Sequence, residues 1–285
     1  MSIDSTNALL IAGSEGGAKV YQLSSGQLIS DINPTGSSLA VAYSPDGAHL
    51  AVGDSNDVAI FHTSDGALAT KLRGHSALVQ RLAWDPGKNT RLASSSEDRS
   101  IRIWNIAIGQ TVVTITEAMR GYATDLSFSP DGQYIAAASG YENDAGIWKV
   151  DDGNLVTRID GDSQTIAYHP TGKWLAIGGS HGVKLLHADT RKIVTQPDSE
   201  KNQRFIRTLA FDHTGKYLAA SWSMSEQLGG AVQLWRVGDD GSLIFVNEVQ
   251  SGTGAINNLV FSGDSKLLVA SSLNGRVVAW ELNTP

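Results

Sequence analysis

Two stretches of this sequence carry side chains that could do chemistry. The run Ser94-Ser95-Ser96 offers hydroxyl groups for a nucleophile, which needs a neighbouring base. The acidic stretch Glu142-Asn143-Asp144, with Asp151 and Asp152 after it, offers oxygen ligands for calcium. Tight packing of small residues explains the serines better. A solvated loop explains the acids better, because the spacing and the closing glutamate of an EF-hand are missing. The histidines are scattered, without an obvious pair.

The glycine-rich segments do not favour phosphate binding. Gly178-Gly179, Gly229-Gly230 and Gly252-Thr253-Gly254 contain the small residues of a phosphate cradle. Such cradles need a following helix, and the sequence shows no helical periodicity of useful length. We interpret these glycines as turn residues.

The composition excludes several classes of protein. The chain has 285 residues and a formal net charge of −7, without the clustered Lys and Arg that nucleic-acid binding requires. It has no cysteine, which excludes disulfides, zinc-thiolate sites and thiol nucleophiles. Residues 1–6 lack the pattern of a signal peptide, and no apolar stretch approaches the roughly 18 residues of a membrane span. We therefore expect a cytoplasmic protein with no cofactor, no metal, no nucleic-acid partner and no membrane association.

A short turn motif recurs along the chain and indicates how it is organised. It occurs as Ser44-Pro45-Asp46-Gly47, Asp85-Pro86-Gly87, Ser129-Pro130-Asp131-Gly132, His169-Pro170-Thr171-Gly172, Asp212-His213-Thr214-Gly215 and Ser262-Gly263-Asp264-Ser265. The second positions are 41, 44, 40, 43 and 50 residues apart, close to the roughly 40–45 residues of a four-stranded propeller blade. The spacing predicts one domain, residues 1–285, with blades at about 1–33, 34–74, 75–118, 119–160, 161–200, 201–251 and 252–285.

Each turn joins two apolar strands into a hairpin. The aromatic residues before the turns, predicted in inner strands beside the core, include Trp84, Phe128, Tyr168, Phe211 and Phe261. A third strand with alternating apolar residues follows, as in Ile101–Trp104, and a fourth completes the unit, as in Leu155–Ile159. Because no such unit can bury both faces alone, the repeat predicts units stacked in a closed ring.

These features resemble the WD40 repeat family over essentially the whole chain. The third blade matches best: His75, Ser94, Asp98 and Trp104 look like the family's hydrogen-bonded tetrad, a structural device that locks the turns of a blade together. In several blades the third-strand tryptophan is followed by a residue other than Asp, so the repeats are degenerate. The resemblance implies an all-β, WD40-like β-propeller of four-stranded antiparallel blades.

The ends of the chain depart from a regular propeller. We expect the first blade to lack its inner strand and the last to lack its fourth. This predicts seven blades, with the first and last incomplete or completed by pairing across the seam. Rings of this family close by completing one blade from both termini, so the ends also suggest an excerpt of a longer, multidomain polypeptide.

A catalytic site in a propeller would gather on the inner strands that line the central channel. The predicted channel residues include Arg81, Asp125, Arg207 and Asn257, with one carboxylate and no histidine. A catalytic metal usually takes about three His or carboxylate ligands, so a metal-dependent hydrolase is not favoured. The alternative function is a lactonase-like or cyclase-like propeller enzyme with a site at the channel mouth.

The loops of blades four and six carry aromatic, Met and Arg residues that the fold does not require. The connections between second and third strands, and the segments that lead into the inner strands, contain Arg120, Tyr122, Tyr141, Phe205, Trp222 and Met224. In WD40-like proteins these segments lie on the narrower top face, and aromatic, Met and Arg residues are enriched at interface hot spots. We therefore predict a non-catalytic scaffold that binds a protein or peptide partner there. The alternative is that Tyr122 and Phe205 cap blade cores and Trp222 packs inward.

Overall fold

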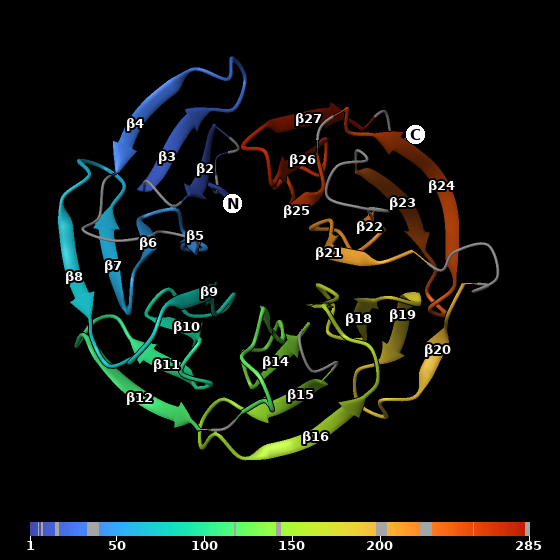
Figure 1. Cartoon of the computed structure of the whole chain (residues 1–285), viewed down its shortest axis with the longest axis horizontal. Coiled ribbons are helices and arrows are strands. Elements are labelled where there is room, and N and C mark those ends of the chain that lie inside the picture. The colour runs from blue at the N-terminus through green and yellow to red at the C-terminus, as the bar shows by residue number, and fades with distance from the viewer. Residues whose placement is uncertain are drawn as a thin grey trace. The chain divides into compact units, whose positions relative to one another are not determined.

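The computed structural model describes residues 1–4, 6, 8–14, 17–32, 40–116, 118–140, 144–197, 204–222, 230–252 and 254–282. Every regular element in these ranges is a β-strand. These ranges contain no helix long and apolar enough to cross a membrane. The strands form seven antiparallel sheets, which we call blades one to seven in chain order (Figure 1). The predicted class, a seven-bladed β-propeller, is confirmed. The chain divides into two compact units, Met1–Ile159 and Asp160–Pro285. That these units form one domain stays a prediction.

The first unit contains blades one to four. Blade one consists of β1 (Ser2–Ile3), β2 (Leu9–Ser14), β3 (Gly17–Gln22) and β4 (Leu28–Ile32). Blade two consists of β5 (Val41–Tyr43), β6 (His49–Asp54), β7 (Asp57–His62) and β8 (Leu68–Leu72). Blade three consists of β9 (Val79–Trp84), β10 (Arg91–Ser96), β11 (Ile101–Asn105) and β12 (Gln110–Ile115). Blade four consists of β13 (Asp125–Phe128), β14 (Tyr134–Ser139), β15 (Asp144–Lys149) and β16 (Leu155–Asp160).

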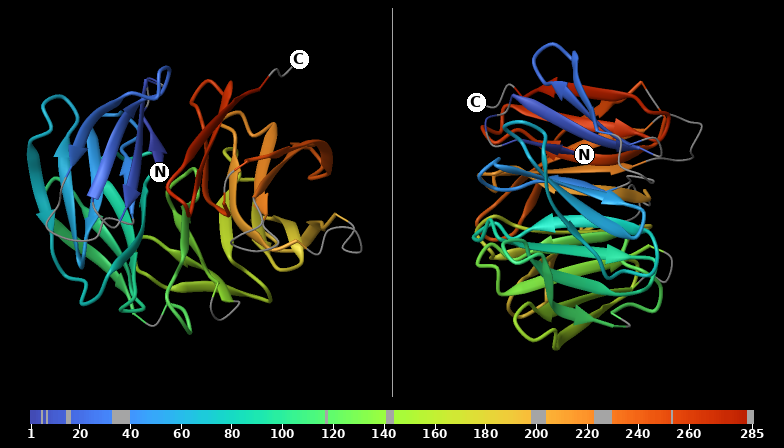
Figure 2. Two further views of the ribbon diagram at one scale, coloured as in Figure 1. Left: turned by 45° about the horizontal axis from the view of Figure 1, so that its top comes forward. Right: turned by 90° about the vertical axis from the view of Figure 1, so that its left-hand side faces the viewer.

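The second unit contains blades five to seven. Blade five consists of β17 (Thr165–Tyr168), β18 (Trp174–Gly179), β19 (Gly182–His187) and β20 (Ile193–Thr195). Blade six consists of β21 (Ile206–Phe211), β22 (Tyr217–Trp222), β23 (Ala231–Val237) and β24 (Leu243–Gln250). Blade seven consists of β25 (Ile256–Phe261), β26 (Leu267–Ser272) and β27 (Val277–Glu281). The neighbouring strands of each sheet lie side by side as a twisted ribbon (Figure 2).

The first blade differs from the prediction that it lacks an inner strand. Ser2 and Ile3 form a two-residue strand that pairs with Ile11 and Leu10 of β2, so the sheet has four strands. Two residues are too few to show an alternation pattern in a sequence, which is why this strand was missed. Among the described residues, blade seven has three strands, as expected.

The turns between first and second strands are built by the recurring motif. In blade two, the Ser44 hydroxyl donates to the Asp46 carboxylate (2.6 Å), and the backbone N–H of His49 donates to Ser44 Oγ (2.9 Å). Gly47 closes the turn at a φ of 70°, a left-handed conformation that glycine adopts without steric cost. In the last blade Ser265 adopts this conformation with a φ of 58°.

The apolar core consists of clusters that each combine two consecutive blades of one unit. In one cluster, Ile101 and Ile103 of blade three pack with Leu126, Ile135 and Trp148 of blade four. This is the expected solution for sheets that cannot bury both faces alone. The residues Trp84, Phe128, Tyr168, Phe211 and Phe261 each end the first strand of a blade, which confirms their predicted place in inner strands.

Candidate functional site

Every blade has two edges that differ in the chemistry they carry. We call the edge where the first and third strands begin the upper edge, and the edge with the turn between first and second strands the lower edge. The four predicted tetrad residues belong to blade three, and its Asp98 lies in the upper turn between β10 and β11. The described candidates for partner binding also lie at upper edges, in blades four and six.

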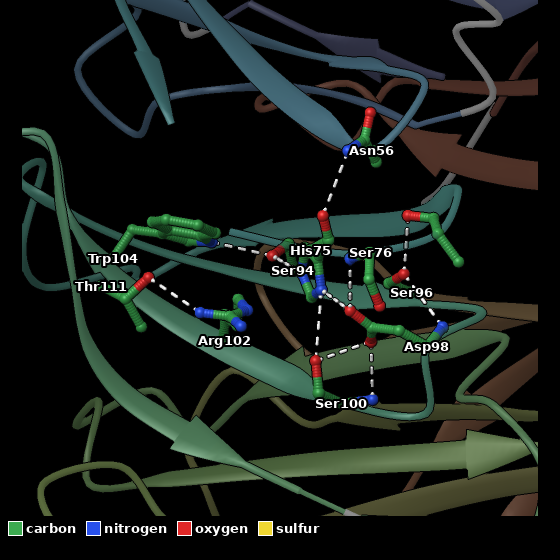
Figure 3. Close-up of polar contacts among 11 residues, drawn as sticks. Asn56, His75, Ser76, Ser94, Ser96, Asp98, Ser100, Arg102, Trp104 and Thr111 are labelled. Atoms are coloured by element: carbon green, nitrogen blue, oxygen red, sulfur yellow. Dashed lines mark hydrogen bonds and ion pairs between the residues drawn. The ribbon is translucent and has the colours of Figure 1, made fainter. Parts of the chain in front are cut away.

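The four side chains of blade three are linked by hydrogen bonds in a single line (Figure 3). The Trp104 indole N–H donates to Ser94 Oγ over 2.8 Å. Ser94 Oγ lies 2.7 Å from Nε2 of His75, and Nδ1 of His75 lies 2.9 Å from the Asp98 carboxylate. Asp98 also accepts the backbone N–H groups of Ser76 and Ser100, so it ties the segment before β9 to the turn before β11.

The direction of these bonds follows from the acceptors. An ionised carboxylate only accepts, so Nδ1 of His75 carries the proton and Nε2 accepts the Ser94 hydroxyl. Burial lowers the pKa of His75 below its ordinary value of 6.5, against the opposing pull of Asp98, and this favours the neutral ring. Burial alone would raise the pKa of Asp98, but hydrogen bonds from Ser100, Ser76 and His75 lower it to about 2. The line therefore consists of a carboxylate and three neutral groups.

Ser94, His75 and Asp98 have the connectivity of a Ser-His-Asp catalytic triad, but their surroundings do not suit catalysis. A nucleophilic serine must be reached by the carbonyl of a substrate. Ser94 is fully buried, and its oxygen already accepts the Trp104 N–H. The arrangement fits a structural role, and that role stays a prediction.

Blades two and four hold their upper edges with ion pairs. In blade two, Nζ of Lys71 lies 2.7 Å from buried Asp54 and 3.3 Å from Asp57, so one ammonium joins the end of β6 to the start of β7. In blade four, Arg158 of β16 lies 3.0 Å from buried Asp144, at the start of β15. These pairs tie the junction of second and third strands to the fourth strand, whereas the hydrogen-bonded line in blade three ties that junction to the segment before the first strand.

Blade six combines an ion pair with an aromatic ring at its upper edge. Ile206 pairs with Trp222, so the residues just before β21 lie beside the end of β22. The guanidinium of Arg204 lies 3.8 Å from the centre of the Trp222 ring, within the range of a cation–π contact. Arg204 also pairs with Glu248 of β24, which accepts the Gln233 amide over 3.0 Å. We call Arg204, Trp222, Gln233 and Glu248 the blade-six cluster.

The blade-six cluster is partly open to solvent. The side chains of Arg204 and Glu248 are 29% and 22% exposed. Trp222 packs against the core of the second unit, and its indole nitrogen is buried with no hydrogen-bond partner among the described residues. Trp222 thus supports the guanidinium, and the open surface belongs mainly to the charged groups. Next to the cluster, the Arg207 guanidinium lies 5.5 Å from the centre of the half-buried Phe205 ring.

The other predicted contact residues are not all placed together. Arg120 is exposed, and its backbone N–H lies 3.3 Å from the Asp144 carboxylate; Tyr122, two residues on, is half-buried. Both belong to the first unit, whereas Phe205 and Trp222 belong to the second. Tyr141 and Met224 lie outside the described residues. The convergence of all six on one face therefore stays a prediction.

Sequence reasoning placed Arg204 on this face without naming it among the candidate contact residues, and it gave no indication of Glu248. The signal for Arg204 was its place beside Phe205, before an inner strand. No comparable signal marks Glu248, because its place opposite Gln233 depends on the register of β23 and β24. Within the ranges that the structure describes, no group of three or more His, Asp or Glu side chains is placed to hold a metal ion.

Comparison with known proteins identifies relatives of the repeats and of the fold. The WD40 family model, described as "WD domain, G-beta repeat", matches residues 66–105, 110–149 and 238–281. The WD repeat-containing protein AAC3 of Dictyostelium discoideum is 28% identical over 59% of this chain and 35% of its own length. An uncharacterized WD repeat-containing protein of Synechocystis is 35% identical over 38% of this chain and 31% of its own length. The chain thus spans about a third of these curated relatives.

A solved structure matches nearly the whole chain in three dimensions. It is a chain of a structure titled "Crystal Structure of Mitotic Checkpoint Complex", with a TM-score of 0.85 over 99% of this chain and 86% of the other. The two sequences are 18% identical, so this likeness concerns the fold alone.

Proposed function

This chain belongs to the WD40 repeat family, and from that membership we propose that it is a non-catalytic scaffold that binds a protein or peptide partner at the upper edges of its blades. The observation that carries the proposal is the blade-six cluster, where Arg204 lies over Trp222 at 3.8 Å with part of its charge open to solvent. Arginine and tryptophan are enriched among the few residues that dominate binding energy at interfaces.

The cluster is suited to binding because its geometry is fixed before a partner arrives. The ring below Arg204 and the carboxylate beside it restrict the side chain to one orientation, which lowers the entropy that binding must remove. On the basis of the sequence alone, we include Arg120, Tyr122, Tyr141 and Met224 in the proposed surface. A cytoplasmic location for this role is likewise a prediction from the sequence.

Arginine variants test the proposal with the least damage to the fold. The full chain captures binding proteins from a cell extract, and the affinity of each identified partner is then measured by calorimetry. We expect Arg204→Ala to weaken binding by about 2 kcal/mol or more, as for other hot-spot residues. Arg236, exposed near the end of β23 at the lower edge of the same blade, provides the matched control. If the Arg204→Ala and Arg236→Ala variants bind the partner with equal affinity, the upper edge is not the binding site.

The alternative is a lactonase-like or cyclase-like enzyme with a site at the channel mouth. Such an enzyme needs convergent metal ligands there. Metal analysis of the purified protein separates the two functions. Calcium or zinc bound in stoichiometric amount would support the enzyme and would overturn the scaffold proposal.

A further inference from the structure

A cavity lies at the lower edge of the first unit, between blades two and three. These two blades pack against each other through one apolar cluster (Figure 1). The cavity is lined by residues near the starts of β6 and β8, before β10, and in the turn between β11 and β12, and its volume is about 400 Å³. Ligand sites have volumes of about 300–1,000 Å³, so this space is large enough for one side chain of a partner.

Part of the cavity wall is an apolar turn at a place where other blades have a polar one. Ile106 and Ile108 lie in the turn between β11 and β12 and line the cavity. Ile108 is 59% exposed. A single exposed isoleucine is common on protein surfaces, but this one borders a cavity and can cover an apolar group inside it. The corresponding turns of other blades contain Ser24-Ser25, Ser64-Asp65, Asp151-Asp152, Asp189-Thr190 and Asp239-Asp240.

The polar part of the lining selects against charged ligands. It consists of the His49 imidazole, the hydroxyl groups of Thr70 and Thr90 and the amide of Asn89. Among the described residues that line the cavity, none is Asp, Glu, Lys or Arg. A charged group that entered would lose its hydration without gaining a carboxylate, ammonium or guanidinium as its partner. The lining therefore suits a neutral group with one apolar and one polar part.

His49 is the lining residue whose hydrogen bonding is incomplete. Its Nδ1 is buried and has no hydrogen-bond partner among the described residues. Buried polar atoms are nearly always paired, so an unpaired one in the wall of a cavity indicates a group that a ligand can complete. A hydroxyl both donates and accepts, and it can therefore bond to the imidazole in either tautomer, whereas a carbonyl oxygen only accepts.

Aromatic rings on two sides hold the His49 imidazole in place. Its centre lies 6.4 Å from that of the Trp84 ring at an angle of 30°, and 5.2 Å from that of His62 at an angle of 43°. Trp84 is itself fixed, because its indole N–H donates to the carbonyl oxygen of Ala42 (3.0 Å). A ligand thus meets a preformed surface, which lowers the entropy that binding must remove.

A phenol meets these requirements best. It is uncharged near neutral pH, its hydroxyl donates and accepts, and its flat ring can cover the apolar turn. An aliphatic side chain would leave His49 unpaired. Tyrosine carries a phenol on a side chain with few rotatable bonds, and it is enriched among the residues that dominate binding energy at protein interfaces.

We propose that this cavity binds the phenol of a tyrosine from a partner protein, with the ring against Ile106 and Ile108 and the hydroxyl bonded to His49. The inference adds a contact at the lower edge to the scaffold proposed above, and it rests on that function for the partner being a protein. The cavity and the blade-six cluster belong to different units of the chain, so they can be tested separately.

Small tyrosine derivatives test the site without a partner protein. N-acetyl-tyrosinamide is added to the full chain carrying isotope-labelled histidine, and the ring signals of the seven histidines are followed by NMR. We expect the His49 signal to shift with a dissociation constant on the order of 1 mM, as for other ligands of this size. N-acetyl-phenylalaninamide should bind about fivefold more weakly, because it leaves His49 unpaired. The phosphorylated tyrosine derivative should also bind at least about fivefold more weakly, because its charge finds no partner.

Variants of the full chain locate the binding. Ala107 lies in the apolar turn and lines the cavity, so Ala107→Leu should fill part of the space and weaken the tyrosine derivative about tenfold. Ser24→Leu adds an apolar side chain at the corresponding exposed position of blade one and should change the affinity less than about twofold. It is the matched control.

His49→Leu tests the hydrogen bond. It should abolish the preference for the tyrosine over the phenylalanine derivative, as followed by the signal of the neighbouring His62. The fold accepts leucine at this position, because Leu9 and Leu267 begin the corresponding strands of blades one and seven. The Ala107→Leu result stands even if the His49 variant fails to fold.

The protein partners captured with the full chain decide whether the phenol belongs to a protein. Ala107→Leu should weaken such a partner about tenfold, as it weakens the derivative. An unchanged partner affinity, with binding of the derivative lost, would mean that the cavity takes a free phenolic compound and would overturn the proposed tyrosine.

Three results would overturn the site itself. These are a His49 signal that does not shift at about 10 mM tyrosine derivative, equal binding of the tyrosine and phenylalanine derivatives, or unchanged binding to a folded Ala107→Leu variant. Failure of the upper-edge proposal looks different, because Arg204→Ala would then retain the partner while the titration with the derivative stays the same.

Discussion

Nε2 of His169 donates a hydrogen bond to the carbonyl oxygen of Gly215, 46 residues further along the chain and 2.8 Å away. His169 begins the lower turn of blade five, and Gly215 lies in the lower turn of blade six. The backbone N–H of Thr171 donates to Nδ1 of the same ring (3.1 Å), so His169 is neutral with its proton on Nε2. One buried side chain thus fastens two consecutive blades.

Blades three and four are fastened at the corresponding place by different residues. Arg91 pairs with Asp85, which begins the lower turn of blade three, and donates to the carbonyl oxygen of Gly132 in the lower turn of blade four. Gly132 and Gly215 therefore share a role, because each offers its carbonyl oxygen to the preceding blade.

We expect Gly215→Ala to destabilise the protein more than Gly275→Ala. Both glycines have a left-handed φ, 74° and 79°, so alanine is strained at either position by roughly 1 kcal/mol. A Cβ at Gly215 would also collide with the His169 ring, whereas nothing lies within 4 Å of one at Gly275. Overpacking of this kind lowers the free energy of unfolding by a further 1–3 kcal/mol, roughly. Denaturant unfolding of the two variants measures the difference, and equal losses would show that the ring moves aside without cost.

Asp85→Ala should lower the free energy of unfolding by roughly 3 kcal/mol, because it removes the buried carboxylate partner of Arg91 and leaves only the exposed Asp151, 3.3 Å away, and the Gly132 carbonyl. The two side chains are 1% and 13% exposed. The double variant Asp85→Leu, Arg91→Met removes both charges and should cost much less. Denaturant unfolding distinguishes the two variants, and a double variant as unstable as the single one would mean that the bond to Gly132 matters more than the charge.

Asp98→Ala should destabilise blade three by about 1–3 kcal/mol, because it removes the acceptor of two backbone N–H groups and leaves the buried Nδ1 proton of His75 only the Ser100 hydroxyl, 3.2 Å away. For a protein of this size we expect the melting temperature to fall by a few degrees for each kcal/mol. Partner binding at blade six should be unchanged. The exposed Asp239 supplies the control, as Asp239→Ala. A melting temperature equal to that of the control would reject the structural role of the hydrogen-bonded line.

Stability should fall as the pH drops below about 6.5. The pKa of His75 is lowered in the folded protein, so the unfolded chain binds the proton more readily and acid favours unfolding. Asp98, with a pKa of about 2 against 3.8, adds a second loss that begins as the pH falls through 3.8. Unfolding free energies at pH 7.5 and 5.5 test the first step. His75→Gln should flatten this slope, whereas His213→Gln, at an exposed position, should leave it unchanged.

The fold could be predicted because its information is local and repeated. The turn motif and the aromatic residue at the end of each inner strand recur at blade spacing, so a few matches were enough to predict seven blades. The two-residue strand Ser2–Ile3 lacks any such pattern. Of the blade-six cluster, the sequence predicted Trp222, and it also predicted the neighbouring Phe205. Its pair of Arg204 and Glu248 depends on a strand register that includes a bulge, and no local pattern encodes that register.

The upper edges of different blades are stabilised by different interactions, and this affects how the sequence of such a chain can evolve. The line in blade three needs four particular side chains at once, and the loss of any one leaves a buried group without its partner. An ion pair, as between Arg158 and Asp144, needs two, and a single substitution opposite an existing charge creates it. A blade that has acquired the pair can lose the other residues one at a time without losing its turn. Sequence similarity between the repeats is therefore lost sooner than the blade structure itself.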